Sequence, residues 1–439
     1  MTKQNSLKRL VRARMAATGQ NYTTARRVVL SQLSGERFGG VVADGYLHLP
    51  GVHPECAALR VLLANSGVLA PHTGEPPSEP LVFGIAGGAG AGAMAFRYER
   101  EDVSSFYVTG WNPFQSSAQA ACERLGMGPT VSETTGARTA ATQLGELLAE
   151  GVPAMAWVDL AELGYAALPP LYSGGSYHTV VVYRYDPQGG TALLGDRARG
   201  PVEVPAERLA AARARIRKQR NRLLSLGSTE LVVNVPGAVR AGLRAAADGP
   251  ASPPTSAMTL EGVRAWAARL HGTAAKDGWP RMFPPGRHLW GALRAVYEFV
   301  EHWGSGGGLM RPMHAEFLRE AAVLLGDRRL DGVAGRYDAL GEAWRALAVA
   351  ALPGEVPLFA ETRALLDRRD AAFAAEGAGA TAELRGIWAR LDVLAEQADA
   401  GFPLDTAAVD ELLRGLKARL DALYEDEVAA RDELRAILG

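Results

Sequence analysis

The chain has 439 residues, of which 48% are hydrophobic and 22% charged, and its formal net charge is −1. This composition is typical of a globular protein, and the length favours two or three domains. No apolar run is long enough to span a bilayer, and the basic N-terminus lacks the apolar segment of a secretory signal, so we expect a cytoplasmic protein with no membrane role. The two cysteines form no C-x-x-C motif, and we expect no disulfide framework, metal or cofactor.

Residues 1–40 form a basic segment in which Glu36 is the single acidic residue. Apolar residues recur at helical spacing over 7–15, and a second helix is expected up to Leu33. We therefore predict a basic helical arm over residues 1–40. Its charge suits an acidic partner such as a carrier protein or a peptide. No aromatic residue other than Tyr22 interleaves with the basic ones, which argues against nucleic acid as the partner.

Residues 51–67, GVHPECAALRVLLANSG, carry the signals of a capped amphipathic helix. Pro54 suits the first helical position, and Gly67 suits the position just after the helix. Cys56 then falls in the first turn, where a thiolate is stabilised and thiol pKa values fall. The alternative is a buried core cysteine, because Cys56 shares a face with Leu59 at helical spacing.

Helical and strand patterns are mixed between residues 41 and 235, which favours an α+β fold over repeated βαβ units. The glycines of residues 84–92 precede a predicted strand rather than a helix, and no G-K-[ST] follows them, so they do not predict a nucleotide-binding loop. The expected helices are Ser117–Leu125, Thr139–Glu150 and Pro205–Arg222. The expected strands are Val41–Leu49, Met94–Glu99, Val152–Leu160, Tyr177–Tyr185, Thr191–Asp196 and Glu230–Val235, and Ser78–Phe83 fits a short helix or strand.

A predicted hairpin brings two polar residues of the chain together. Two strands flank the turn sequence DPQGG, a strong turn signal. The returning strand places Asp196 near residue 180, on the same face as His178. A carboxylate beside an imidazole is the pair that activates a nucleophile. The hairpin therefore predicts a His178–Asp196 pair, and the alternative is a surface ion pair at a strand end.

The stretch 247–256, ADGPASPPTS, is the clearest linker of the chain. Beyond it every segment has apolar residues at the helical period, which predicts a separate all-α domain over 257–439. The long final helix suits a homodimer, and burial within the monomer explains the same apolar stripe. The expected helices are Leu260–Leu270, His288–His302, Met313–Leu325, Val333–Ala351, Leu358–Ala375, Ala382–Ala398 and Asp405–Leu438.

Several short motifs occur in a fixed order: H-P-E-C-A-A-L-R, then APHTG-x-P-x-SE-x-x-x-FGI-x-GG, then W-V-D-L and H-T-V-V-V-Y. Together they resemble the N-terminal domain of butirosin biosynthesis protein H. The later segment GGGLMRPMHAEFLREAAVLLG resembles the uncharacterised helical domain that often follows it. The resemblance implies an α+β, papain-like cysteine-peptidase-type domain over residues 41–246, joined to the all-α domain over 257–439.

The resemblance also implies a chemistry, because the namesake moves an acyl group from an acyl carrier protein thioester to an amine of a small molecule. Here Cys56 would take the acyl group, His178 would act as base and then acid, and Asp196 would orient His178. The basic arm, or the basic stretch Arg213–Arg222, would dock the acidic carrier protein or a peptide substrate. The residues that we expect to bind substrate are His53, Glu55, Gln115 and Asp159.

Two positions depart from the family pattern. Members often carry cysteine directly after the histidine, where this chain has Pro54, so either Cys56 acts from a shifted register or the nucleophile is lost. The stretch 110–115, GWNPFQ, lacks the histidine that members tend to have there, although its Gln115 can still donate a hydrogen bond to an oxyanion. The alternative functions are a non-catalytic module that presents a peptide or carrier protein to a partner enzyme, and a metal-dependent enzyme that uses His53, Cys56 and His178.

Overall fold

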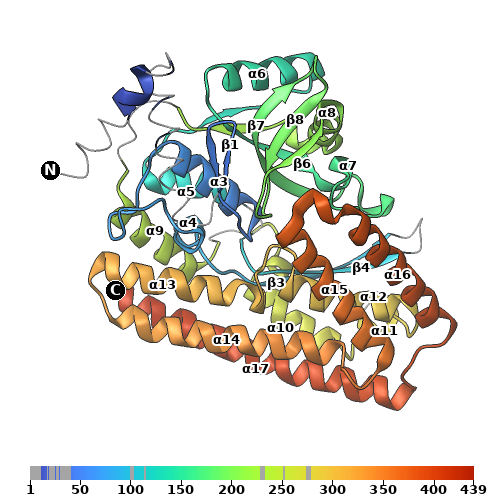
Figure 1. Cartoon of the computed structure of the whole chain (residues 1–439). Coiled ribbons are helices and arrows are strands. Elements are labelled where there is room, and N and C mark those ends of the chain that lie inside the picture. Colours follow the sequence, from blue (N-terminus) through green and yellow to red (C-terminus); the bar gives the residue numbers. More distant parts are fainter. Residues whose placement is uncertain are drawn as a thin grey trace. The chain divides into compact units, whose positions relative to one another are not determined.

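The computed structural model describes residues 11–16, 18, 25, 29, 41–98, 103–112, 115–227, 233–250, 253–272 and 278–439. The chain divides into two compact units (Figure 1). The first unit comprises residues 1–82, 125–235 and 371–385, and the second comprises 83–124, 236–370 and 386–439. Most of the basic arm predicted over 1–40, including nearly all of its second helix, lies outside the described residues.

The first unit is built on a six-stranded antiparallel sheet, which confirms the predicted α+β class together with the helical segments of the chain. Its strands lie in the order β5-β10-β6-β7-β8-β9. A separate hairpin, β1 (Val41–Ala43) with β2 (Tyr46–His48), precedes the helix α3 (Pro54–Asn65). The strands of the sheet are β5 (Thr130–Ser132), β6 (Ala154–Asp159), β7 (Tyr177–Asp186), β8 (Thr191–Gly195), β9 (Val202–Pro205) and β10 (Leu223–Ser225).

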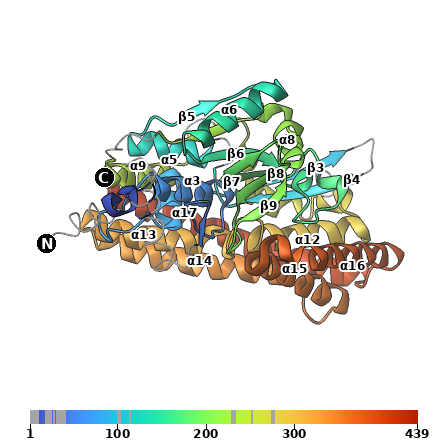
Figure 2. The ribbon, with the colours of Figure 1, turned by 45° about the horizontal axis from the view of Figure 1, so that its top comes forward.

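Helices cover both faces of this sheet, as the apolar run VVVY in β7 requires. The helix α3 packs on β7 and β6 from one side. The helices α6 (Ala137–Ala149) and α8 (Ala206–Arg215) pack on the other side, where Leu144 and Leu209 join Val180 and Val182 in one apolar core (Figure 2). The short helix α7 (Leu160–Leu163) follows β6 directly.

The register of the β7–β8 hairpin agrees with the predicted one at the end that carries Asp196. Val181 pairs with Gly195, so Asp196 continues the strand opposite residue 180. The Asp186 carboxylate accepts hydrogen bonds from the backbone N–H groups of Gln188 and Gly189, which closes the DPQGG turn. A β-bulge between Val182 and Arg184 then shifts the register by one residue. Without this bulge, the pairing at the tip would place Asp196 opposite residue 181, so the turn and the bulge together put Asp196 on the face of His178.

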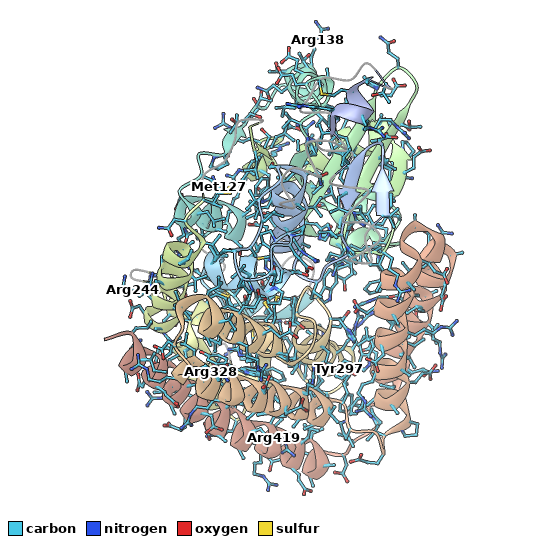
Figure 3. The ribbon with its side chains drawn as sticks, turned by 60° about the vertical axis from the view of Figure 1, so that its left-hand side comes forward. Met127, Arg138, Arg244, Tyr297, Arg328 and Arg419 are labelled. Carbon is cyan, nitrogen blue, oxygen red and sulfur yellow. The ribbon has the colours of Figure 1, made fainter. Side chains whose placement is uncertain are left out.

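The second unit is mainly helical and also contains a β-hairpin, β3 (Gly92–Tyr98) with β4 (Val103–Thr109). Charged side chains such as those of Arg328 and Arg419 project outward from its helices (Figure 3). The helices α4 (Glu79–Ala86) and α15 (Pro357–Glu376) are among those that contribute residues to both units. The other long helices are α5 (Ser117–Leu125), α9 (Val235–Asp248), α10 (Leu260–Arg269), α12 (Arg287–Glu301), α13 (Arg311–Leu325), α14 (Arg329–Ala351), α16 (Thr381–Ala400) and α17 (Thr406–Leu438).

The structure accounts for two sequence features of the second unit. The apolar residues of α17 are buried, and this helix packs on α10 and α14, so its stripe needs no second copy of the chain. A Cβ atom at Gly84 would overlap the ring of Phe317, and one at Gly88 would overlap the ring of His314. These glycines of the 84–92 stretch therefore serve close packing.

The compact units do not follow the linear order of the predicted domains. Residues 83–124 belong to the second unit, and residues 371–385 belong to the first. The domain boundaries predicted from the sequence, 41–246 and 257–439, thus remain predictions. Of the strand predicted over 230–235, residues 230–232 lie outside the described residues, and Val235 begins the helix α9.

Candidate functional site

The N-terminus of α3 is capped by His53, whose backbone is extended. Its Nδ1 accepts a hydrogen bond of 3.2 Å from the backbone N–H of Cys56. Burial, with smaller contributions from Arg197 and His178, lowers the pKa of His53 to about 3. His53 is therefore a neutral imidazole with its proton on Nε2, and it satisfies one of the unpaired N–H groups of the helix end. Pro54 occupies the first helical position, as predicted.

The loop that enters α3 is held by Glu79, a buried residue that the sequence reasoning missed. Its carboxylate accepts hydrogen bonds from the backbone N–H groups of Val52, at 3.0 Å, and His53, at 2.7 Å. Burial raises the pKa of Glu79, and these two bonds and the charge of Arg60 oppose that rise. The sequence did carry a signal for Glu79: it is the acidic residue of the motif APHTG-x-P-x-SE and directly precedes an apolar run.

The His178 and Asp196 side chains meet at the end of the β7–β8 hairpin. The His178 Nε2 atom lies 2.8 Å from Asp196 Oδ1, and both residues are 6% exposed. Because an ionised carboxylate can only accept, Nε2 carries the proton and Nδ1 of a neutral ring is left as a base. Among the residues that the structure describes, none forms a hydrogen bond with this Nδ1.

Two further donors fix the Asp196 carboxylate. The hydroxyl of Tyr165 donates to Oδ2 at 2.7 Å, and the backbone N–H of Arg197 donates to Oδ1 at 2.7 Å. Burial alone would raise the pKa of Asp196, but the charge and hydrogen bond of His178, with Arg197 and Tyr165, outweigh it and hold this pKa well below its usual range. Asp196 is therefore an anion at neutral pH, and the sequence carried no signal for Tyr165 as its partner.

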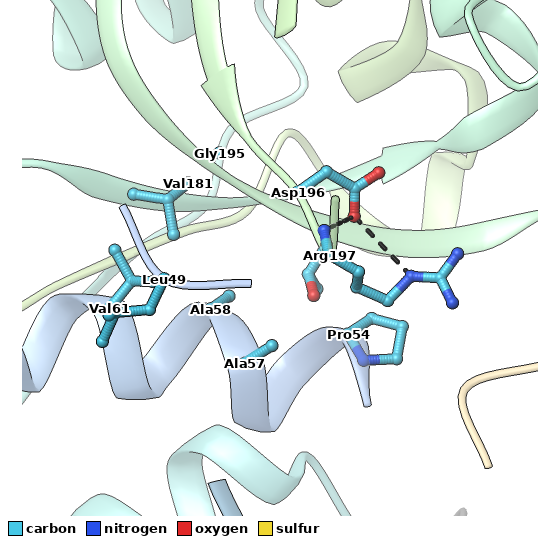
Figure 4. A pocket seen from close by; sticks show the side chains of 10 residues that line it. Leu49, Pro54, Ala57, Ala58, Val61, Val181, Gly195, Asp196 and Arg197 are labelled. Atoms are coloured by element: carbon cyan, nitrogen blue, oxygen red, sulfur yellow. Dashed lines mark hydrogen bonds and ion pairs between the residues drawn. The ribbon is translucent and has the colours of Figure 1, made fainter. Parts of the chain in front are cut away.

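Strand alternation directs the side chain of His178 away from the body of α3. A small cavity between α3 and the hairpin is lined by Thr179 and Val181, whose neighbours on the helix include Ala57 and Ala58 (Figure 4). His178 has the opposite parity and shares its face with Val180 and Val182. Asp196 nevertheless lines the same cavity, with Arg197 and Pro54, so the pair borders the start of α3 (Figure 4).

Cys56 is fully buried, with 0% exposure. The helix residues that line the cavity are Pro54, Ala57, Ala58 and Val61. At 3.6 residues per turn, Cys56 is rotated by roughly 140–160° from Pro54, Ala58 and Val61. Its side chain thus points away from the side of α3 that packs on the hairpin.

The remaining predicted substrate residues have other surroundings. Glu55 accepts a hydrogen bond of 3.2 Å from the indole N–H of Trp157. Asp159 is fully buried, where it caps α7 through Ala161 and accepts from Gly174 and from the Ser176 hydroxyl. Gln115 belongs to the second unit, where it lines a small cavity with Trp111 and Asn112. Their part in substrate binding stays a prediction.

The basic stretch 213–222 is less available for docking than its charge indicates. The guanidinium of Arg213 is buried and donates to the backbone carbonyls of Ala140 and Asn221. Arg222 forms an ion pair with Glu133 at 2.7 Å. A docking surface in this stretch would therefore rest on the exposed residues between them, such as Arg217 and Lys218.

Two negative findings apply to the described residues. Within them, no group of three or more His, Cys, Asp or Glu side chains is arranged to hold a metal ion. Across the same ranges, every helix is too short or too polar to cross a membrane.

These features define an α+β protein in which the N-terminus of a helix and a buried His–Asp pair lie at one end of an antiparallel sheet. Residues 53–197 match the family butirosin biosynthesis protein H, N-terminal, and residues 207–356 match a domain of unknown function (DUF4872). The predicted resemblance and the order of its two parts are thereby confirmed, and the first match is to a biosynthetic protein. No curated protein matches the chain.

Proposed function

We propose that the protein is an acyl- or peptidyltransferase of natural-product biosynthesis, with a papain-like first unit. It would move an acyl group from a carrier-protein thioester to an amine of a small molecule. The observation that carries this proposal is the buried His178–Asp196 pair, whose carboxylate is ionised and whose imidazole keeps Nδ1 as a base. The biosynthetic family of residues 53–197 supports the choice of reaction.

In the covalent route, Cys56 gives its proton to Nδ1 of His178 as its sulfur attacks the thioester carbonyl. The carbon–sulfur bond to the carrier breaks, and the carrier sulfur takes the proton from His178. The amine then attacks the acyl-Cys56 carbonyl, and its proton passes through His178 to the departing Cys56 sulfur. The products are an amide and the carrier thiol, and the protein returns to its starting state.

In the direct route, the amine attacks the carrier thioester without an acyl-enzyme. His178 then takes the amine proton and passes it to the carrier sulfur, and Cys56 is a core residue. The burial of Cys56 and its place on the far side of α3 favour this route. The same observations also favour the second candidate function, a non-catalytic module that holds a peptide or carrier protein for a partner enzyme.

The experiment incubates the protein with an acyl-pantetheine thioester and an amine, and measures amide formation and intact mass. Cys56→Ser, His178→Gln and, as a matched control at the other buried cysteine, Cys122→Ser are compared with the unchanged chain. An acyl adduct that disappears only with Cys56→Ser and His178→Gln supports the covalent route. Turnover that survives Cys56→Ser but falls at least 100-fold with His178→Gln supports the direct route.

The proposal fails if His178→Gln turns over at the rate of the unchanged chain. The non-catalytic module would be supported if carrier-protein binding persists in His178→Gln and Cys56→Ala but is lost when residues 1–40 are removed. That last variant also tests the basic arm as the docking surface for an acidic carrier protein.

A further inference from the structure

The Asp196 carboxylate is positioned by a segment that neither family match includes. Residues 371–385 lie beyond the matched ranges 53–197 and 207–356, yet they belong to the first compact unit. They comprise the end of α15, a 3-10 turn and the start of α16. Several of their side chains are buried in the core under the sheet: Phe373, Ala380 and Leu384.

Phe373 contacts both side chains that flank the carboxylate. Its ring stacks on the ring of Tyr165, with the centroids 6.0 Å apart and the planes at 12°. The guanidinium carbon of Arg197 lies 5.4 Å from the centroid of the same Phe373 ring. Tyr165 donates to Oδ2 of Asp196, and the Nε of Arg197 lies 3.7 Å from Oδ1.

Hydrogen bonds tie the same segment to the backbone on either side of the pair. The Thr381 hydroxyl lies 2.9 Å from the carbonyl oxygen of Tyr165 and 2.7 Å from that of Ala378, so its one proton is shared between the two acceptors. The backbone N–H of Arg199 donates to the carbonyl of Ala374 at 3.1 Å. The residue that holds Oδ2 and the strand end that carries Asp196 are therefore both anchored to residues 371–385.

The contact with the Phe373 ring holds the guanidinium of Arg197 in place. Its Nε is buried and has no hydrogen-bond partner among the described residues. The nearest opposite charge is Asp196, the same carboxylate that His178 uses. A cation released from the Phe373 ring would be free to move onto Oδ1 and compete with the imidazole N–H.

We propose that residues 371–385 form a positioning segment for the His178–Asp196 pair, in which Phe373 holds Tyr165 and Arg197 on either side of the carboxylate and Thr381 fixes the backbone of Tyr165. These are positioning residues, because they act on the imidazole through Asp196. The inference rests on the proposed function only for its consequence in catalysis. The geometry that it asserts can be tested without a substrate.

The test measures how fast the Nε2 proton of His178 exchanges with water, by proton NMR of the whole protein labelled with ¹⁵N-histidine. The resonance is identified by its loss in His178→Gln. Tyr165→Phe removes one donor to Asp196, Phe373→Leu removes the ring, and Thr381→Val removes the hydroxyl. Since a single hydrogen bond is at stake, each should speed the exchange roughly 3- to 10-fold.

Two control variants distinguish positioning from general destabilisation. Phe373→Tyr keeps the ring and should restore slow exchange. Phe359→Leu removes a fully buried ring from the second unit and should leave the exchange unchanged. Thermal unfolding of each variant shows whether it folds. If Phe373→Leu does not fold, Thr381→Val still tests the proposal.

The proposal is overturned if Tyr165→Phe speeds the exchange while folded Phe373→Leu and Thr381→Val match the unchanged chain. It is also overturned if Phe359→Leu speeds the exchange as much as Phe373→Leu does. Loss of transferase activity plays no part in these outcomes. If the proposed function fails its test, the exchange result still stands. If the exchange result goes against the positioning segment, the proposed function is not affected.

Discussion

Replacing Asp196 by asparagine tests the electrostatic description of the site. The carboxylate accepts three hydrogen bonds, from His178, the Tyr165 hydroxyl and the Arg197 backbone. In Asp196→Asn the two bonds to Oδ1 survive as neutral ones, whereas an amide N–H₂ replaces the acceptor that faces Tyr165. Charged hydrogen bonds contribute about 1.5–3 kcal/mol and neutral ones about 1, so we expect a loss of roughly 3–5 kcal/mol in the free energy of unfolding at pH 7.

The effect should depend on pH with a defined sign. The folded-state pKa of Asp196 lies below its unfolded value of about 3.9. Its contribution to stability is therefore present at neutral pH and is lost as the pH falls below about 4 towards the folded-state pKa. The difference in free energy of unfolding between the unchanged chain and Asp196→Asn should shrink over that same pH range, because a protonated carboxyl resembles an amide.

The assay is urea unfolding of the whole chain between pH 3 and pH 8, and hydrogen exchange of the β7 and β8 amides reports on the first unit. Asp186→Asn is the matched control, because Asp186 is an exposed residue of the same hairpin whose turn bonds asparagine can also form. The reasoning would be refuted if Asp196→Asn lowered the free energy of unfolding by less than about 0.5 kcal/mol at pH 7. It would also be refuted if the loss were the same at pH 3 and pH 8.

Three further predictions concern the packing around the site and in the second unit. Glu79→Ala leaves the buried N–H of His53 and the partly buried N–H of Val52 without their acceptor. It should lower the free energy of unfolding in urea by roughly 2–5 kcal/mol, whereas exposed Glu150→Ala should lower it by under about 0.5 kcal/mol. Gly84→Ala drives a methyl into an aromatic ring and should lower the melting temperature sharply, whereas Gly386→Ala, whose Cβ meets open space in α16, should hold or raise it. Burial raises the pKa of Cys122 to about 12, so iodoacetamide at pH 8 should leave it unlabelled in peptide mass mapping, and rapid labelling would contradict its burial.

The sequence alone was sufficient for the features that depend on neighbours along the chain. The helix α3, its Pro54 start and its Gly67 end follow from local capping preferences, and all three are present. The DPQGG turn and strand alternation predict a hairpin with His178 and Asp196 on one face, and both features are present. The β-bulge between Val182 and Arg184, which brings Asp196 opposite residue 180, had no signal in the sequence. The order of short motifs was enough to identify the family.

Tertiary structure decided which side chains complete the site. Glu79 binds the backbone before α3, and Tyr165 binds Asp196 from another part of the chain. Phe373 reaches the same carboxylate's neighbours from more than a hundred residues away in sequence, although the helical pattern around it predicts no more than a helix. Such partners are chosen by the packing of distant segments around a buried charge. Local periodicity and turn chemistry carry no information about that packing, because its free energy comes from contacts that exist only when the core is closed.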